Sequence, residues 1–204
     1  GLKDPKHPKA MTLSQLLNFT AEAGFDAIDL TGYFFASYPK APTDAEIFAV
    51  KHEAFRLGLE ISGSGVKNEV TTADQALRVE GKQRIKDWVE VCVKLGAPVL
   101  RVFADTNIPP HKWQVVSGGA SRDVVEGWIA DDFRECAEFA AARGIFLGVQ
   151  NHGDFLTTGV EHVSLLKRVN HPNCRAIVVV ARSDIAALEH DIATQAALNE
   201  KVAA

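Results

Sequence analysis

Short apolar runs and helical patterns alternate along this chain. A helical pattern comes first, and five pairs of an apolar run and a helical pattern follow it. We expect strands at Phe25–Thr31, Leu59–Ser62, Pro98–Ala104, Gly144–Gln150 and Ala176–Ala181. We expect helices at about 12–23, from Thr43, and at about 72–95, 122–143, 159–169 and 183–204. Strands separated by helices in this way must run parallel, with right-handed crossovers.

Local signals mark where the helices begin and end. Four helical patterns end in glycine, which adopts the left-handed conformation after a last helical turn without strain. These glycines are Gly24, Gly58, Gly96 and Gly144. Thr12 with Gln15, and Thr43 with Glu46, have the spacing of a capping box at a helix start. The boundaries of the strand–helix units therefore follow from the sequence.

Apolar stripes predict which helix faces are buried. In the helix over 72–95 the stripe is Ile85, Trp88, Val89 and Cys92. In the helix over 122–143 it is Val125, Ile129, Phe133 and Cys136, and in that over 159–169 it is Val160, Val163, Leu166 and Val169. Residues at these spacings share one side of a helix. We expect them to form the core rather than to contact a cofactor.

Two α/β architectures fit this order of elements. One is a parallel (βα) barrel, and the other is an open, doubly wound parallel sheet. Both place their ligands at the carboxyl ends of the strands. At 204 residues, we expect one domain over residues 1–204. The polar residues that follow the strands are therefore the candidates for a functional site.

Composition and charge exclude several classes of function. Hydrophobic residues make up 47% of the chain and charged residues 24%, as in ordinary globular proteins. The net charge is −4, and no basic stripe is present, so we expect no nucleic acid partner. The longest apolar runs are far shorter than a membrane helix, so we expect no membrane partner. The three cysteines form no CxxC motif, which favours reduced thiols in a cytoplasmic protein.

Polar side chains follow several of the expected strands. Gln150 and His152 fall on the same face of the fourth strand if its geometry continues, because side chains alternate. Asp29 ends the first strand, and Lys67 lies in the glycine-containing loop after the second. Arg101 lies within the third strand, where a charge needs a partner, either a ligand anion or a structural Asp. Together these residues predict a site for a metal or a polar substrate.

The long connection after the third strand contains further ligand-capable side chains. It runs from Asp105 to Ser121 and includes His111 and Trp113. Connections of this length between a strand and a helix often form lids or binding loops. These two side chains could close over a ligand, although a histidine in an exposed loop usually has no such role.

Four segments resemble the sugar phosphate isomerase/epimerase family of xylose isomerase-like (βα)8 barrels. They are AGFDAIDL at 23–30, LGLEISGSG at 57–65, LGAPVLRVFA at 95–104 and GVQNHGDF at 148–155. Each segment alone is weak, but their order and spacing together are fairly specific. The resemblance covers about residues 12–170. It implies a barrel of about 250 residues, so this chain would lack the first and last strands.

The resemblance also implies a chemistry. It implies a divalent metal, Mn, Mg or Zn, and proton transfer next to a carbonyl through an ene-diolate. Gln150 takes the place of a metal-binding Glu in the family pattern, and His152 matches its His, with Asn151 between them. The next ligand would be an Asp where Val180 stands, so Asp184 would serve only after a shift of register. The resemblance thus implies metal ligands Gln150 and Asp184 and a catalytic His152.

Three functions remain open at this stage. The first is a metal-dependent isomerase or epimerase of a sugar or sugar phosphate, with Asp29, Lys67, Arg101, Asn151 and His152 contacting the substrate. The second is a non-catalytic, barrel-derived binding or assembly module, in which another copy of the chain covers the exposed sheet edges. A homo-oligomer is therefore one expected assembly. The third, a nuclease of the related apurinic-endonuclease barrels, is disfavoured by the acidic balance of charge.

Overall fold

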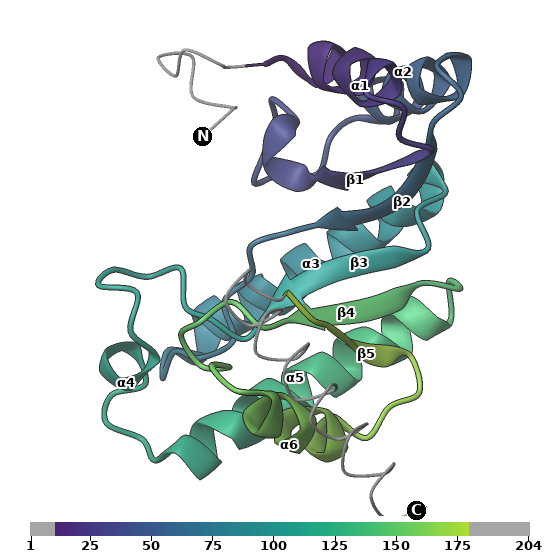
Figure 1. Ribbon diagram of the computed structural model, residues 1–204. Helices are drawn as coiled ribbons and strands as arrows, with labels where there is room; N and C mark the ends of the chain where they lie inside the picture. The colour runs from purple at the N-terminus through teal and green to yellow at the C-terminus, as the bar shows by residue number, and fades with distance from the viewer. Residues whose placement is uncertain (1–10, 180–204) are drawn as a thin grey trace, which may run out of the picture.

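The fold is a run of parallel strands and helices in a computed structural model that describes residues 11–179. Figure 1 shows the elements in chain order. The helices are α1 (Leu13–Glu22), η1 (Gly32–Phe34), α2 (Asp44–Arg56), α3 (Gln75–Leu95), α4 (Trp113–Val116), α5 (Arg122–Ala141) and α6 (Gly159–Val169). The strands are β1 (Ala27–Thr31), β2 (Glu60–Gly65), β3 (Val99–Phe103), β4 (Phe146–Gln150) and β5 (Cys174–Ile177).

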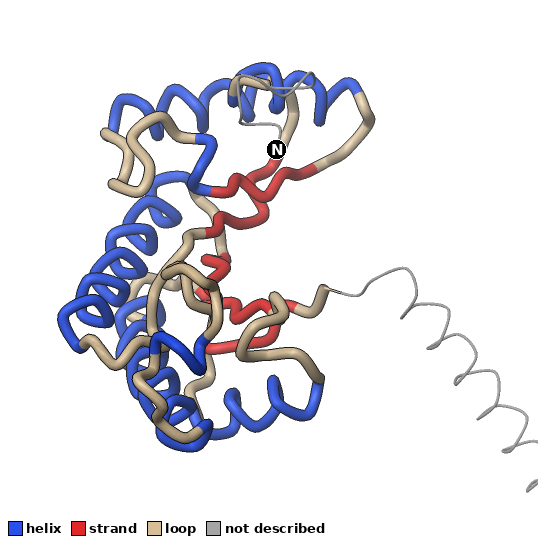
Figure 2. Tube along the Cα trace, turned by 90° about the vertical axis from the view of Figure 1, so that its left-hand side faces the viewer, coloured by secondary structure: helices blue, strands red, loops and turns tan. Residues whose placement is uncertain are grey.

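The five strands form one parallel sheet in the order β1-β2-β3-β4-β5. The helices lie outside the curved sheet, and the inner face of the strands is turned away from them (Figure 2). A doubly wound sheet would reverse its strand order and carry helices on both faces. That alternative is therefore wrong for this chain. The arrangement is an arc of a (βα) barrel.

The core lies between the outer face of the strands and the helices. From the sheet it contains Leu30, Leu100, Val102, Leu147 and Val149, all fully buried. From α3 and α5 it contains the predicted stripes, including Ile85, Trp88, Ile129 and Phe133. The predicted capping boxes at Thr12 and Thr43 are formed. Gly24, Gly58, Gly96 and Gly144 all have positive φ angles, as the helix ends require.

Helix α6 buries only part of its predicted apolar stripe. Val169 is buried and Leu166 packs against the core, but Val160 and Val163 are 82% and 51% exposed, and His162 and Leu165 are buried in their place. Both arrangements have helical spacing, so periodicity alone cannot choose between them. The His162 side chain is buried, and burial lowers the pKa of this imidazole, while the backbone of Val149 acts in the opposite direction. The rotation of the helix therefore depends on its packing against the rest of the fold.

The fifth strand begins and ends earlier than the valine run predicts. It pairs with β4 from Leu147 with Cys174 to Gln150 with Ile177. Val178 and Val179 follow the strand and are more than half exposed. A strand forms where a neighbour offers backbone partners, and here the register of β4 places those partners before the valines. Val180, Asp184 and the expected helix over 183–204 lie outside the described residues.

The fold bears on two expectations from the sequence, those about the cysteines and about membrane helices. Cys92, Cys136 and Cys174 are buried free thiols, and burial raises the pKa of each to about 12. They are therefore unreactive core side chains. Within residues 11–179, no helix has both the length and the apolar character that crossing a membrane requires.

Candidate functional site

The register of β3 and β4 brings two polar residues together beyond the sheet. Phe103 and Gln150 are paired at the ends of these neighbouring parallel strands. Asp105 and His152 each follow two residues later, so they emerge side by side. The His152 Nδ1 lies 2.7 Å from the Asp105 Oδ2. The strand pairing thus builds a carboxylate–imidazole pair at the carboxyl edge of the sheet.

Asp105 is held firmly enough to orient the imidazole. Its other carboxylate oxygen accepts hydrogen bonds from the backbone N–H groups of Asp154 and Phe155, at 3.3 and 3.2 Å. A carboxylate only accepts hydrogen bonds, so the Nδ1 of His152 carries the proton in this pair. The Phe103 ring packs edge-on against the imidazole, with 4.9 Å between ring centroids. In the neutral ring, Nε2 is therefore left with a lone pair that can accept a proton.

A cavity of about 290 Å³ adjoins this pair. Its walls come from the loops that follow β2, β3 and β4. They include Lys67, Phe103, His111, Lys112, His152 and Asp154. The His152 side chain is 55% exposed, whereas that of Asp105 is 11% exposed. The imidazole is thus accessible to a small molecule, while its orienting carboxylate is shielded from water.

Two carboxylates, the buried Glu69 and the half-buried Asp154, fix the loops around the cavity. Asp154, after β4, accepts hydrogen bonds from the backbone N–H of Trp113 at 3.0 Å and of Thr106 at 3.5 Å. Burial raises the pKa of Asp154, and these backbone donors oppose the rise. Glu69, after β2, accepts from the Thr106 hydroxyl at 2.7 Å and from the Asn107 N–H at 2.8 Å. The loop after β3 is therefore tied to the loops on both sides of it.

Trp113 supports the wall instead of closing over a ligand. Its side chain is buried and packs edge-on against Phe155, with 5.2 Å between ring centroids. His111, by contrast, is exposed and lines the cavity. Of the two residues singled out in this long connection, the structure brings only His111 to the cavity.

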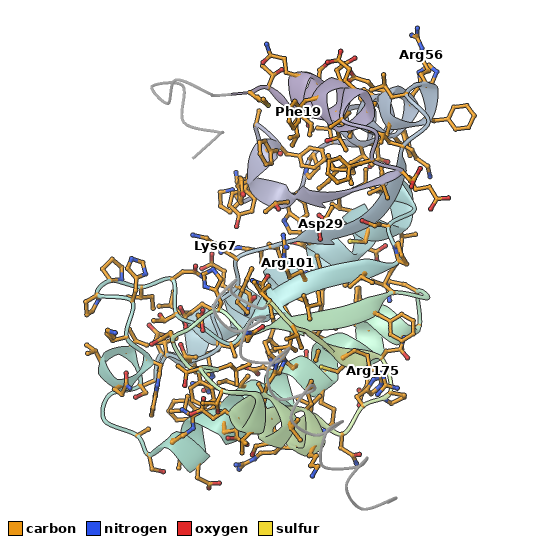
Figure 3. The ribbon with its side chains drawn as sticks, viewed as in Figure 1. Phe19, Asp29, Arg56, Lys67, Arg101 and Arg175 are labelled. Atoms are coloured by element: carbon orange, nitrogen blue, oxygen red, sulfur yellow. The ribbon has the colours of Figure 1, made fainter. Side chains whose placement is uncertain are left out.

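Asp29 and Arg101 contact each other on the inner face of the sheet. The Arg101 Nη2 donates to the Asp29 Oδ1 at 3.2 Å and to the Thr31 Oγ1 at 2.9 Å. Burial raises the pKa of Asp29, and the Arg101 charge opposes the rise. A Cβ at position 65 would lie 2.8 Å from the guanidinium, so Gly65 leaves room for the arginine. Figure 3 shows both side chains, with Lys67 beyond β2.

These placements answer the question that the sequence raised about Arg101. Its partner among the described residues is the structural carboxylate of Asp29. Neither residue lines the cavity beside His152. A contact between this pair and a substrate stays a prediction.

The other predicted site residues have different neighbours. The Asn151 side chain makes two hydrogen bonds with the backbone of Val179, at 2.8 and 3.0 Å, and so connects the segments after β4 and β5. Gln150 ends β4 between Phe103 and Ile177, whose side chains offer no metal ligand. Asp184 lies outside the described residues.

This donor set does not fit a tightly bound divalent metal. Hard cations take several oxygen ligands, usually including carboxylates, and Gln150 supplies a single neutral amide oxygen. Within residues 11–179, no three His, Cys, Asp or Glu side chains are grouped as metal ligands. The metal ligands Gln150 and Asp184 stay a prediction from the sequence.

Asp105, Asp154 and Lys112 were not selected from the sequence, although a signal was present for the two aspartates. Asp105 follows an apolar strand by two residues, just as His152 does, and the same rule about strand ends selects both. Asp154 lies two residues beyond His152 in the same segment. Only the pairing of Phe103 with Gln150 shows that Asp105 and His152 meet.

Known proteins share this fold. A solved structure of D-psicose 3-epimerase in the presence of D-fructose is 20% identical, with a TM-score of 0.66, covering 83% of this chain and 58% of that one. D-Psicose 3-epimerase with D-tagatose, from Clostridium cellulolyticum H10, is 18% identical, with a TM-score of 0.66 and coverages of 81% and 57%. The apo form of the E. coli 3-keto-D-glucoside 4-epimerase YcjR is 16% identical, with a TM-score of 0.66 and coverages of 86% and 65%.

Structural similarity at these sequence identities establishes the fold alone. The chain spans 57 to 65% of the length of the three epimerases. No curated protein matches the sequence. The model of one family, described as the xylose isomerase-like TIM barrel, matches residues 17–181, which is most of the chain. The parallel strand order and the one-sided layer of helices agree with that match. The chain therefore belongs to the xylose isomerase-like TIM barrel family.

Proposed function

We propose that this protein is an isomerase or epimerase of a sugar or sugar phosphate, with His152 as its acid–base residue. The observation that carries the proposal is the Asp105–His152 pair at the edge of a small cavity. Solved structures of similar fold are epimerases of psicose and of 3-keto-D-glucoside, which supports the same class of substrate. The cavity lies at the carboxyl ends of the strands, where this fold places its chemistry.

His152 would move a proton to and from carbon. Its Nε2 takes the proton from the carbon next to the substrate carbonyl, and the electron pair of the broken C–H bond moves onto the carbonyl oxygen as an ene-diolate forms. Delivery of a proton from solvent to the other face of that carbon inverts its configuration and leaves the first proton on His152, which returns it to water. Return of the proton by His152 to the neighbouring carbon, with transfer of the hydroxyl proton to the former carbonyl oxygen, shifts the carbonyl. Asp105 keeps the ring in the tautomer that leaves Nε2 free and stabilises the imidazolium once the proton has transferred.

Exchange of substrate hydrogen with heavy water tests this proposal directly. We expect D-fructose, D-psicose or a phosphorylated ketose to gain deuterium beside its carbonyl when incubated with the protein in D₂O, as seen by NMR. Proton abstraction by an exchangeable imidazole requires this result, whichever product is finally released. A panel of ketoses and aldoses that shows neither exchange nor binding would overturn the proposal.

Metal binding is a separate prediction, and titration of chelator-treated protein with Mn²⁺ checks it. Sites with few charged ligands bind hard cations with Kd values of about 10⁻⁴ to 10⁻³ M. Because the described residues offer only the neutral amide oxygen of Gln150 at this position, we expect Mn²⁺ to bind no more tightly than that. Micromolar binding that Gln150→Ala or Asp184→Ala removes would contradict this expectation and would support the ligand pair inferred from the sequence.

Two further expectations from the sequence belong to this proposal. Contact of Asp29, Arg101 and Asn151 with the substrate is proposed: the Arg101 Nε is buried without a hydrogen-bond partner among the described residues, while its Nη2 and the Asn151 amide already bond within the protein. Self-association is proposed as well, and light scattering over a range of protein concentrations measures it.

A further inference from the structure

We propose that the cavity beside His152 takes a substrate with an anionic group, a phosphate or a carboxylate, which binds Lys67 and Lys112. This inference rests on the proposed function for the carbohydrate part of the ligand. It narrows the proposed sugar or sugar phosphate to a sugar that carries a negative charge, and it assigns the residues that bind this charge.

Two lysines bring positive charge to the cavity, and the charge of Lys112 also acts to lower the pKa of Asp154 in the same wall. Lys67 comes from the loop after β2 and Lys112 from the loop after β3, and both line the cavity. Both residues are exposed, and neither ammonium forms an ion pair or hydrogen bond with a residue between 11 and 179. By contrast, Lys82, Lys86 and Lys94 each pair with a carboxylate on the outside of the fold. The charges at the cavity are therefore available to a ligand.

The carboxylates of the cavity are already engaged by the protein. Asp105 bonds to the His152 imidazole and to two backbone N–H groups. Asp154 accepts from the backbone of Trp113 and Thr106, and its burial also raises its pKa. Their hydrogen-bonding oxygens are therefore occupied by donors of the protein, whereas the two lysine ammonium groups are not bonded within residues 11–179. The lysines are thus the charged groups of the cavity that an anionic ligand can engage.

A third group adds to this surface. His111 lines the cavity and has a φ angle of 62°, a left-handed conformation that is uncommon outside glycine. Its backbone N–H donates to the carbonyl of Ile108 at 2.8 Å, which closes the turn before Lys112. His111 and Lys112 are consecutive in this turn, and both line the cavity. Hydrogen bonds from a cationic group to carboxylate or phosphate oxygens are stronger than those between neutral groups.

The size of the cavity limits the ligand. A volume of about 290 Å³ lies at the lower end of the range for small-molecule sites. It suits one sugar unit with a single charged substituent. In this arrangement the lysines would hold the charged end, and His152 would face the carbonyl end of the same molecule.

Calorimetric titration with four probes tests the inference on the intact chain. The probes are D-fructose, D-fructose 6-phosphate, D-glucuronate and inorganic phosphate. We expect at least one of the two acidic sugars to bind at least about tenfold more tightly than D-fructose. A hydrogen bond to a charged group contributes about this much to affinity. The double variant Lys67→Met/Lys112→Met, which keeps side-chain length but removes both charges, should abolish this advantage. Lys167→Met, at an exposed lysine of α6 away from the cavity, is the matched control and should keep it.

The outcomes separate this inference from the proposed function. Equal affinity for D-fructose and the acidic sugars, unchanged in the double variant, overturns the anionic site even if deuterium exchange succeeds. Lysine-dependent binding of phosphate without exchange in any sugar supports the anionic site and overturns the sugar chemistry. Preference for D-fructose 6-phosphate or for D-glucuronate identifies the anion as a phosphate or a carboxylate. No binding of any probe overturns the inference.

Discussion

Replacing His152 with glutamine is expected to lower kcat for deuterium exchange by about 10²- to 10⁴-fold, the usual contribution of a general acid–base group. Glutamine can still form hydrogen bonds, but its amide cannot act as a general acid or base near neutral pH. KM should change much less, because the imidazole acts on the transition state and the walls of the cavity remain. Initial rates over a range of substrate concentrations, from NMR in D₂O, separate the two parameters.

Asp105→Asn distinguishes orientation from simple structural support. An asparagine keeps the size of the side chain, but its amide can present an N–H to Nδ1 and so favour the wrong tautomer of His152. We expect kcat to fall by about tenfold or more and the pH profile of kcat to shift, with the unfolding temperature nearly unchanged. His52→Gln, at an exposed histidine of α2, is the control and should leave the rate intact.

Full activity in His152→Gln would refute the assignment of the acid–base role to His152.

Gly81→Ala is expected to destabilise the fold by about 2 kcal/mol or more. A Cβ at this position in α3 would lie 2.0 Å from the carbonyl oxygen of Glu69, and backbone cannot move aside as a flexible side chain can. Alanine is more favourable in a helix than glycine by about 1 kcal/mol. The expected loss of stability is therefore the cost of the clash with Glu69 less this gain. Thermal unfolding should show a fall in Tm of roughly 4–8 °C for a chain of this size.

The same substitution has a matched control in the next long helix. At Gly127 in α5, a Cβ would meet the far end of the Arg168 side chain at 2.9 Å, which can move. Gly127→Ala should therefore leave Tm unchanged or raise it slightly, by the gain in helix propensity of up to about 1 kcal/mol. If Gly81→Ala were as stable as Gly127→Ala, the close approach of α3 to the loop after β2 would be wrong.

The Gly81 contact also bears on the cavity. Glu69, whose backbone packs on Gly81, holds Thr106 and Asn107 through its carboxylate. A shift of Glu69 would loosen the loop that carries His111 and Lys112. We therefore expect binding of acidic sugars to weaken in Gly81→Ala, in proportion to its loss of stability. Stability and affinity are linked here because one loop contributes to both.

The local order of the fold was predictable from the sequence. Capping boxes at Thr12 and Thr43 and glycines at the helix ends are local signals, since they act within one helical turn. The stripes of α3 and α5 were equally clear, because no competing face of those helices is apolar. His152 and Lys67 were selected because they follow strands, and both line the cavity.

Other features depended on long-range contacts. The face that α6 buries, with His162 and Leu165 on it, is decided by packing against the rest of the fold, and the limits of β5 are decided by its register with β4. Asn151 looked like a substrate ligand, yet its amide is used by the backbone of Val179. The periodicity of a single sequence does not indicate which residues meet across the fold. It therefore could not predict the buried face of α6, the limits of β5 or the contact of Asn151.

The sequence by itself therefore determined the alternation of parallel strands and helices, the ends of most elements, and the edge of the sheet at which chemistry is expected. These follow from patterns that act over a few residues. The tertiary structure alone decided between barrel arc and doubly wound sheet, joined Asp105 to His152, and paired Arg101 with Asp29. Each of those results depends on which strands are neighbours and on their register, and both are set by the packing of segments far apart in the chain.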